Sequence, residues 1–129
     1  MPEAALTRVL VTGSRGWTDE ARIRAAFAAV EERTPRPWIL VVGDARGADQ
    51  LARKEAALRG WETEMWIADW DRYGRRAGFR RNAEMVERGA DLALAFWDGQ
   101  SRGTAHAMQL CRAKGIFLEV FEVDDVSRS

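Results

Sequence analysis

Short apolar runs alternate with segments of helical periodicity, and this alternation constrains the fold more than any other feature of the sequence. The runs that predict strands are residues 8–12, 38–42, 62–67, 92–96 and 116–123. Apolar residues that recur three or four positions apart predict helices between a cap at Thr18 or Asp19 and Pro35, and at 49–58, 81–88 and 104–114. Strands that are apolar throughout are typical of a parallel sheet covered by helices on both faces. The sequence therefore predicts an α/β fold, doubly wound around a mainly parallel five-stranded sheet.

Length and composition are those of one domain. A chain of 129 residues, 47% of them hydrophobic, can bury a core without disulfides or metals. We expect a single domain over residues 1–129, with its core at about 8–123 and loose ends on either side. Right-handed crossovers favour a Rossmann-like or flavodoxin-like strand order. In such sheets ligands bind beyond the carboxyl ends of the strands, at the switch in strand direction.

Charge and cysteine content exclude several classes of protein. The 20 basic and 20 acidic residues give a net charge of zero, so no global field attracts nucleic acid or an anionic membrane. A single cysteine, Cys111, excludes an internal disulfide framework and a cysteine-rich zinc site, and a single histidine, His106, also argues against zinc. No apolar run approaches the roughly 20 residues of a transmembrane helix, and the first residues do not resemble a signal peptide. We expect a soluble cytoplasmic protein with no metal, no bound cofactor and no membrane partner.

Three predicted loops at the carboxyl ends of strands combine glycine with arginine, at residues 13–17, 43–49 and 98–104. Glycine lets the backbone approach a ligand, and the helix that follows each loop presents unpaired N–H groups that favour phosphate. Arginine can bind an anion through two hydrogen bonds. Any one of these loops can equally be an ordinary tight turn. Three of them at one edge of the sheet favour a local anion site.

The connection between the third strand and the next helix, residues 69–82, is the longest and is predicted to be a loop. Its arginines are interleaved with aromatic residues, a pattern that suits a nucleotide or a single-stranded nucleic acid. A solvated charged lid is the alternative interpretation. The five arginines are Arg72, Arg75, Arg76, Arg80 and Arg81.

Five of the six tryptophans divide into two groups by their position in the predicted elements. Trp17, Trp70 and Trp97 fall in loops at the proposed site, so we assign only these three to function. Trp61 and Trp66 fall in or near the third strand, so we assign them to the core.

Four motifs occur in order: Gly-Ser-Arg at 13–15, Gly-x-Ala-Arg-Gly-Ala-Asp at 43–49, Ala-Gly-x-x-Arg-Asn-x-x-Met at 77–85 and Ser-Arg-Gly-Thr at 101–104. With these motifs the chain resembles, over about residues 9–120, the SLOG superfamily, a Rossmann-like group that includes DprA/Smf and the Lonely Guy enzymes. The YspA-type (YpsA-related) branch is the most similar. The resemblance implies a nucleotide-derived ligand whose phosphates bind at Gly103 and Thr104. It also implies a homodimer, because related SLOG proteins often pair.

The Lonely Guy enzymes hydrolyse the N-glycosidic bond of nucleoside monophosphates, and their pattern is only partly present. Their Arg-Lys-x-x-Met helix is similar to residues 81–85, but Ala107 stands at the position of their catalytic glutamate. A methyl group cannot stabilise an oxocarbenium ion as a carboxylate can. Whether the chain is an enzyme therefore stays open, and hydrolysis would need another carboxylate. The candidates are Asp44, Asp49, Glu84 and Asp98, of which we favour Asp98, while Asp49 is expected to cap its helix. The first turn of the last helix also holds His106, whose catalytic role would need a positioned partner.

DprA-like proteins share the Gly-Ser-Arg, Ala-x-Gly-x-Asp and Arg-Asn elements and bind single-stranded DNA. The neutral net charge and the presence of only two lysines argue against this function, because binding to DNA irrespective of sequence needs a basic groove. The arginines of residues 72–81 favour binding to single-stranded DNA.

We expect the chain to bind, and to sense or process, a nucleoside phosphate or an ADP-ribose-like molecule at the crevice between the first and fourth strands. Single-stranded DNA binding and N-glycosidic hydrolysis are the alternatives. If there is turnover, Asp98 and Arg81 are the candidate catalytic residues. The predicted ligand contacts are Gly13, Ser14, Arg15, Gly43, Arg46, Asp49, Arg81, Asn82, Asp98, Gly99, Ser101, Arg102, Gly103 and Thr104.

Overall fold

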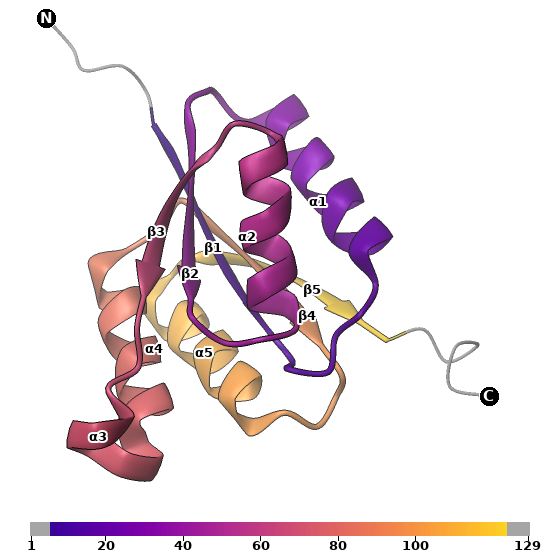
Figure 1. Cartoon of the computed structure of the whole chain (residues 1–129). Helices are drawn as coiled ribbons and strands as arrows, with labels where there is room; N and C mark the ends of the chain where they lie inside the picture. Colours follow the sequence, from indigo (N-terminus) through magenta and orange to yellow (C-terminus); the bar gives the residue numbers. More distant parts are fainter. Residues whose placement is uncertain (1–5, 124–129) are drawn as a thin grey trace, which may run out of the picture.

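The computed structural model describes residues 6–123, and its centre is a five-stranded sheet in the order β3-β2-β1-β4-β5 (Figure 1). Every neighbouring pair of strands is parallel. The strands are β1 (Thr7–Gly13), β2 (Trp38–Gly43), β3 (Glu62–Trp66), β4 (Leu92–Trp97) and β5 (Phe117–Glu122). The strand order reverses between β1 and β4, as in Rossmann-like sheets. The predicted α/β fold is confirmed, whereas the loose ends expected on either side lie outside the described residues.

Helices cover both faces of the sheet. One face carries α1 (Glu20–Arg33) and α2 (Ala48–Leu58), and the other carries α4 (Ala77–Arg88) and α5 (Arg102–Lys114). The short α3 (Trp70–Tyr73) and a single 3₁₀ turn, η1 (Gly74–Arg76), precede α4 at the lower left of Figure 1. Within residues 6–123, no helix combines the length and apolar character needed to cross a membrane.

The two helical layers have separate cores because side chains alternate along each strand. In β1, Val9 and Val11 pack against α1 and α2, whereas Leu10 points to the opposite face and packs with Met85 of α4 and Cys111 of α5. The two central neighbours of β1, strands β2 and β4, follow the same alternation. The apolar character of these three strands therefore reports burial on both faces.

The edge strands depart from the prediction that all strands are apolar and buried. In β3, Glu62 and Thr63 are exposed, and Met65 is also largely exposed. In β5, Phe117 is exposed at the other edge of the sheet. An edge strand has only one neighbour and incomplete helix cover, so polar residues are tolerated there.

The connection over residues 69–82 was predicted to be a loop, and this prediction is wrong. Asp69 caps α3, where its Oδ1 accepts a hydrogen bond from Arg72 N at 3.1 Å. Gly74 then turns the chain with a φ of +57°, and α4 begins at Ala77, before the predicted start at Arg81. Ala77 is buried, so packing extends this helix through a stretch that carries few apolar side chains.

Candidate ligand-binding site

A cavity of about 200 Å³ opens at the carboxyl ends of β1 and β2, under α4 and the first turn of α5. It lies on the α4 and α5 face of the sheet, where Thr12 and Gly43 are small enough to leave space above the strands. Nine of the predicted contacts line it: Gly13, Arg15, Gly43, Asp49, Arg81, Asn82, Ser101, Gly103 and Thr104. The other lining residues are Val11, Thr12, Ala45, Trp70, Arg75, Gly78, Phe79 and Met85.

The remaining predicted contacts lie outside this cavity. Arg46 lines a second hollow beside it. Ser14, Asp98, Gly99 and Arg102 line neither space. The structure therefore brings residues from all four motifs together at the cavity, and Asp98 is not part of its lining.

Gly43 makes room for the side chains that form the floor of the cavity. A Cβ atom at this position would lie 2.6 Å from Arg81 Nη1 and 2.8 Å from Asp49 Oδ2. Gly13 has a different role, because its Cβ would lie 2.7 Å from the carbonyl oxygen of Phe96 and would also clash with the Cβ of Ala48. The missing side chain of Gly13 thus lets α2 pack on β1, and the prediction that Gly13 also lies against the ligand stays a prediction.

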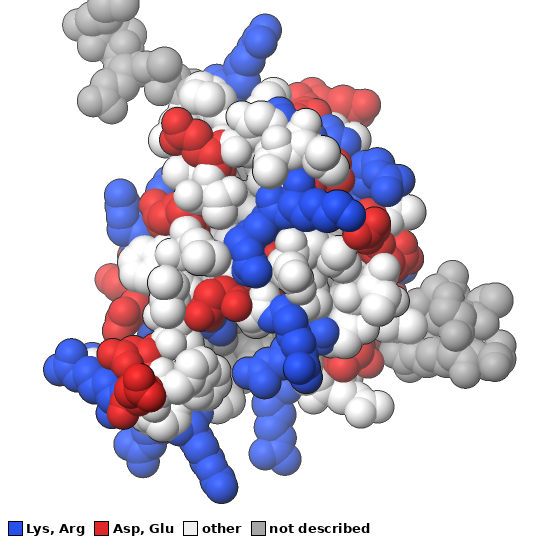
Figure 2. Space-filling view, in the orientation of Figure 1, with Lys and Arg blue, Asp and Glu red and all other residues white. Residues whose placement is uncertain are grey.

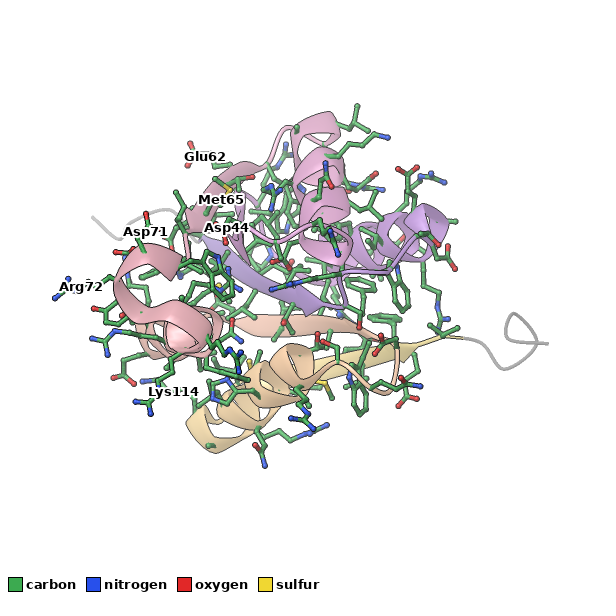
Figure 3. All side chains as sticks on the ribbon, turned by 60° about the horizontal axis from the view of Figure 1, so that its bottom comes forward. Asp44, Glu62, Met65, Asp71, Arg72 and Lys114 are labelled. Carbon is green, nitrogen blue, oxygen red and sulfur yellow. The ribbon has the colours of Figure 1, made fainter. Side chains whose placement is uncertain are left out.

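A chain of hydrogen bonds connects the floor of the cavity across three elements. Arg81 on α4 donates from Nη1 to Asp44 Oδ1 at 2.7 Å and from Nε to Asn82 Oδ1 at 3.0 Å. Asn82 Nδ2 in turn donates to the carbonyl oxygen of Gly103 at 3.2 Å. Asp44, labelled in Figure 3, directly follows β2. The chain therefore fixes α4 against both the β2–α2 loop and the start of α5.

Asp49 is a buried carboxyl group at the floor, with 5% of its surface exposed. Its Oδ2 accepts a hydrogen bond of 3.3 Å from Ala45 N, and within residues 6–123 it takes part in no ion pair. Burial raises the pKa of Asp49 from 3.8 to about 6, although the nearby Arg81 and Arg53 guanidinium groups oppose this shift. The expectation that Asp49 caps α2 is wrong, because the cap residue is Gly47 and Asp49 faces the cavity.

Asp98 shapes the loop between β4 and α5. Its Oδ1 accepts hydrogen bonds from the backbone N–H groups of Ser101 and Gln100, both at 2.8 Å. These bonds lower the pKa of the Asp98 carboxyl below its usual value. The carboxyl group that we favoured for catalysis is therefore engaged with its own loop.

Ser14 joins the three loops at this edge of the sheet, and it is buried. Its N–H donates to the carbonyl oxygen of Phe96 at 2.9 Å, and its Oγ accepts from Asp98 N at 3.0 Å. Its carbonyl oxygen accepts from Ala48 N, the start of α2, at 3.1 Å. Ser14 thus fixes the loops to one another and does not line the cavity.

The first turn of α5 presents backbone groups to the cavity. Ser101 is the cap residue, and its Oγ accepts a hydrogen bond from Thr104 N at 3.4 Å and lies 3.1 Å from Thr104 Oγ1. A Cβ at Gly103 would meet no atom within 4 Å, so open space adjoins this residue. The N-terminus of a helix combines unpaired N–H groups with a positive dipole end, which suits a phosphate. This end of the cavity can hold an anion.

The rim of the cavity consists of exposed side chains from the segment before α4 and from its first turn. Trp70 is 47% exposed, and the guanidinium of Arg15 lies 5.9 Å from the centre of its ring. Phe79 contacts His106 edge to face, with ring centres 4.8 Å apart. Among residues 6–123, the buried Nδ1 of His106 has no hydrogen-bond partner, and burial lowers the pKa of its ring. His106 lies behind Phe79 and does not line the cavity.

Of the three tryptophans assigned to function, Trp70 alone lines the cavity. Trp17 is a core residue, so its assignment was wrong: its ring packs against Phe96 at 5.5 Å. Trp97 donates from Nε1 to the carbonyl oxygen of Ser101 at 3.0 Å and so stabilises the loop before α5. The assignment of Trp61 to the core is confirmed, since it is buried and stacks on Phe27.

Phe79 lines the cavity but was not predicted to do so, although the sequence carries a signal for it. Arg75, Phe79 and Asn82 are spaced four and three residues apart, which places such side chains on one face of a helix. This spacing carries information only if the segment is helical, and we had predicted a loop there. Thr12 and Ala45 carried no such signal.

The parallel sheet in the order β3-β2-β1-β4-β5, with a cavity at the carboxyl ends of its strands, is typical of a Rossmann-like α/β protein. The family model described as "YspA, cpYpsA-related SLOG family" matches residues 7–73, from β1 through α3. The chain is also 42% identical over 116 residues to the "Gene 61 protein" of Mycobacterium phage D29, covering 86% of this chain and 93% of that relative. The chain therefore belongs to the YspA, cpYpsA-related SLOG family. The homodimer expected from the resemblance stays a prediction.

Proposed function

We propose that the cavity binds a nucleotide-derived small molecule, such as a nucleoside phosphate or an ADP-ribose-like ligand. Membership of a SLOG family favours a nucleotide-related ligand in general terms. The observation that carries the proposal is that Arg81 and the first turn of α5 meet in one cavity beside the switch in strand direction. Ligands of doubly wound sheets bind at this place.

The cavity offers complementary groups for the parts of a nucleotide. The backbone N–H of Gly103 and the hydroxyl of Thr104 suit a phosphate, whereas the Thr104 N–H is bound to Ser101 Oγ. Arg81 has N–H donors beyond those bound to Asp44, Asn82 and the Trp66 carbonyl oxygen. The ring of Trp70 is exposed at the rim and can stack on a base. A sugar hydroxyl could donate a hydrogen bond to the carboxyl group of Asp49, which accepts one from Ala45 N at 3.3 Å.

A titration of the wild type and a Gly103→Val variant with nucleoside mono- and diphosphates tests the proposal. Valine would project into open space, so the variant should fold cooperatively but lose nucleotide binding. Gln109→Val is the matched control, because Gln109 is an exposed residue further along the same helix. Unchanged nucleotide affinity in Gly103→Val would contradict this placement of the phosphate. A response only to short single strands, lost at moderate salt, would favour nucleic acid.

A second candidate function, N-glycosidic hydrolysis of a nucleoside monophosphate, is favoured by the position of Asp49. Water would add to the C1′ atom of the sugar while the bond from C1′ to the base breaks, and the base would leave with a proton. Such a reaction needs a carboxylate near the sugar, and of the carboxylates considered Asp49 lines the cavity, whereas Asp98 does not. Asp49 therefore replaces Asp98 in this hypothesis.

Release of free base from nucleoside monophosphates tests hydrolysis directly. The Asp49→Asn variant should retain binding and lose turnover, since the amide keeps the shape of the carboxyl group but cannot carry its charge. Glu84→Gln is the control, because Glu84 is an exposed carboxylate that does not line the cavity. A wild-type protein that binds the nucleotides without releasing base has no such activity.

A further inference from the structure

A second hollow of about 290 Å³ adjoins the cavity on its outer side. It is lined by Arg15, Asp44, Ala45, Arg46, Trp70 and Arg81. Four of these residues, Arg15, Ala45, Trp70 and Arg81, also line the inner cavity, so the two spaces share a wall. We call this second hollow the outer groove.

The charge of the outer groove is positive, because three arginines and one aspartate line it. Asp44 is already paired with Arg81. Neither Arg15 nor Arg46 forms an ion pair with another residue of the described range 6–123. Figure 2 shows Lys and Arg side chains around the middle and at the lower edge of the face of Figure 1, with Asp and Glu side chains between them. The two unpaired guanidinium groups of the groove are suited to an anion.

The positions of the arginines are set by the first two loops of the sheet. Arg15 follows β1, and its guanidinium lies against the ring of Trp70. Arg46 belongs to the β2–α2 loop, and Gly47 beside it, with a φ of +74°, lies so close to the Arg15 carbonyl group that no side chain fits there. This contact between the backbones of the two loops holds Arg15 and Arg46 at the same groove.

The inner cavity alone is smaller than the usual site for a small molecule. Small-molecule sites usually enclose roughly 300–1,000 Å³, whereas the inner cavity measures about 200 Å³. A ligand that occupies both spaces would be of the usual size and would pass Trp70 and Arg81 on its way out.

We propose that the outer groove is a second anionic subsite, and that the ligand is a nucleotide with a further phosphate linked beyond the first. The inference rests on the proposed function. One phosphate binds at the first turn of α5, and the further phosphate, with any group attached to it, lies between Arg15 and Arg46. A nucleoside monophosphate fills only the inner part of this site.

Calorimetric titration of the whole chain with the four common nucleoside monophosphates, the matching diphosphates and ADP-ribose tests the inference. The best diphosphate should bind roughly tenfold more tightly than its monophosphate, since charged hydrogen bonds of this kind are worth about one power of ten in Kd. Arg46→Ala should remove this gain and leave monophosphate affinity unchanged, because Arg46 does not line the inner cavity. Arg46→Lys should retain part of it.

Arg112→Ala is the control for loss of a positive charge, because Arg112 is exposed in the last turn of α5, away from both spaces. Arg46 is itself exposed, so its replacement should not affect folding. Equal affinity for mono- and diphosphates, or an equal loss for both in Arg46→Ala, would overturn the second subsite while the proposed function stands. If no mononucleotide, diphosphate or ADP-ribose binds, the proposed function itself fails.

Discussion

The floor and the rim of the cavity are built in different ways. The floor consists of buried groups around Gly43, where Arg81 and Asn82 are fixed by hydrogen bonds and Asp49 is enclosed by protein. The rim includes Trp70 of α3, Arg75 of the 3₁₀ turn η1 and Phe79 of the first turn of α4, and all three side chains are exposed. The fold therefore sets the geometry of the floor before any ligand binds, whereas the rim side chains are exposed to solvent. Changes at the floor should alter stability, and changes at the rim should alter binding alone.

The largest expected effect belongs to Gly13→Ala. The added Cβ would meet the carbonyl of Phe96 and the Cβ of Ala48, both held by regular structure. Neither β4, which holds Phe96, nor α2, which holds Ala48, can move without disturbing its packing. We therefore expect a loss of about 3 kcal/mol or more in the free energy of unfolding. Denaturant unfolding measures it. Gly103→Ala is the matched control and should be neutral or slightly stabilising, because its Cβ meets open space and alanine favours helix. Equal stabilities would remove the distinction between these glycines.

The next effect concerns the pH dependence of stability at Asp49. Its pKa is about 6 in the folded protein and 3.8 when unperturbed. The folded state thus holds the proton more tightly, so stability should fall as pH rises from about 4 to 6 and should stay reduced above it. This shift corresponds to about 3 kcal/mol at neutral pH. Asp49→Asn should therefore be more stable than the wild type at pH 7.5 but not at pH 4, as measured by urea unfolding at both pH values. If Asp49→Asn is destabilised equally at both pH values, ionisation of Asp49 does not destabilise the folded protein.

Asp98 should show the opposite sign. Its pKa is lowered, so the ionised carboxyl group stabilises the folded state at neutral pH, and that contribution is lost as pH falls below about 4. Asp98→Ala should lower the melting temperature at pH 7 and cost less stability near pH 3. Thermal unfolding of the two proteins across this range is the measurement. A difference in melting temperature that does not change with pH would mean that the loop does not depend on the charge.

The smallest effect on stability is expected at the rim. Trp70→Ala should change the free energy of unfolding by less than about 1 kcal/mol, because half of the side chain is already exposed. Nucleotide affinity should fall roughly tenfold or more, since stacking of a base on an aromatic ring is worth about 1–3 kcal/mol. Phe117→Ala is the aromatic control on the exposed edge strand β5. If both variants bind nucleotide equally well, Trp70 does not contact the base.

The sheet and much of the floor could be predicted from the sequence. Apolar runs report burial on both faces, and the motifs around Gly43, Asp49 and Arg81 placed these residues at one edge because parallel strands end there together. Side-chain direction could not be predicted in the same way. In the sequence, Asp49 and Asp98 look alike, because each is an aspartate in a loop or at the start of a helix. Asp49 faces the cavity because of the packing around Gly43, and the sequence does not show this packing.

The rim was also beyond sequence patterns. Arginines dominate residues 72–81, so the apolar periodicity that marks a helix is weak there. Burial of Ala77 and Met85 decides the structure of that segment, and this burial exists only once α4 packs against the rest of the protein. The direction of Trp17 was missed for a similar reason, since its burial depends on Phe96, far away along the chain.

The hydrogen bond between Ser14 Oγ and Asp98 N has a consequence for synthesis of the protein, because its two residues are 84 positions apart. The amino-terminal loop leaves the ribosome long before its partner loop is made. The edge of the sheet that bears the cavity therefore cannot be completed until β4 and the loop after it have been made. A chain that lacks β4 and this loop should therefore not hold the proposed ligand.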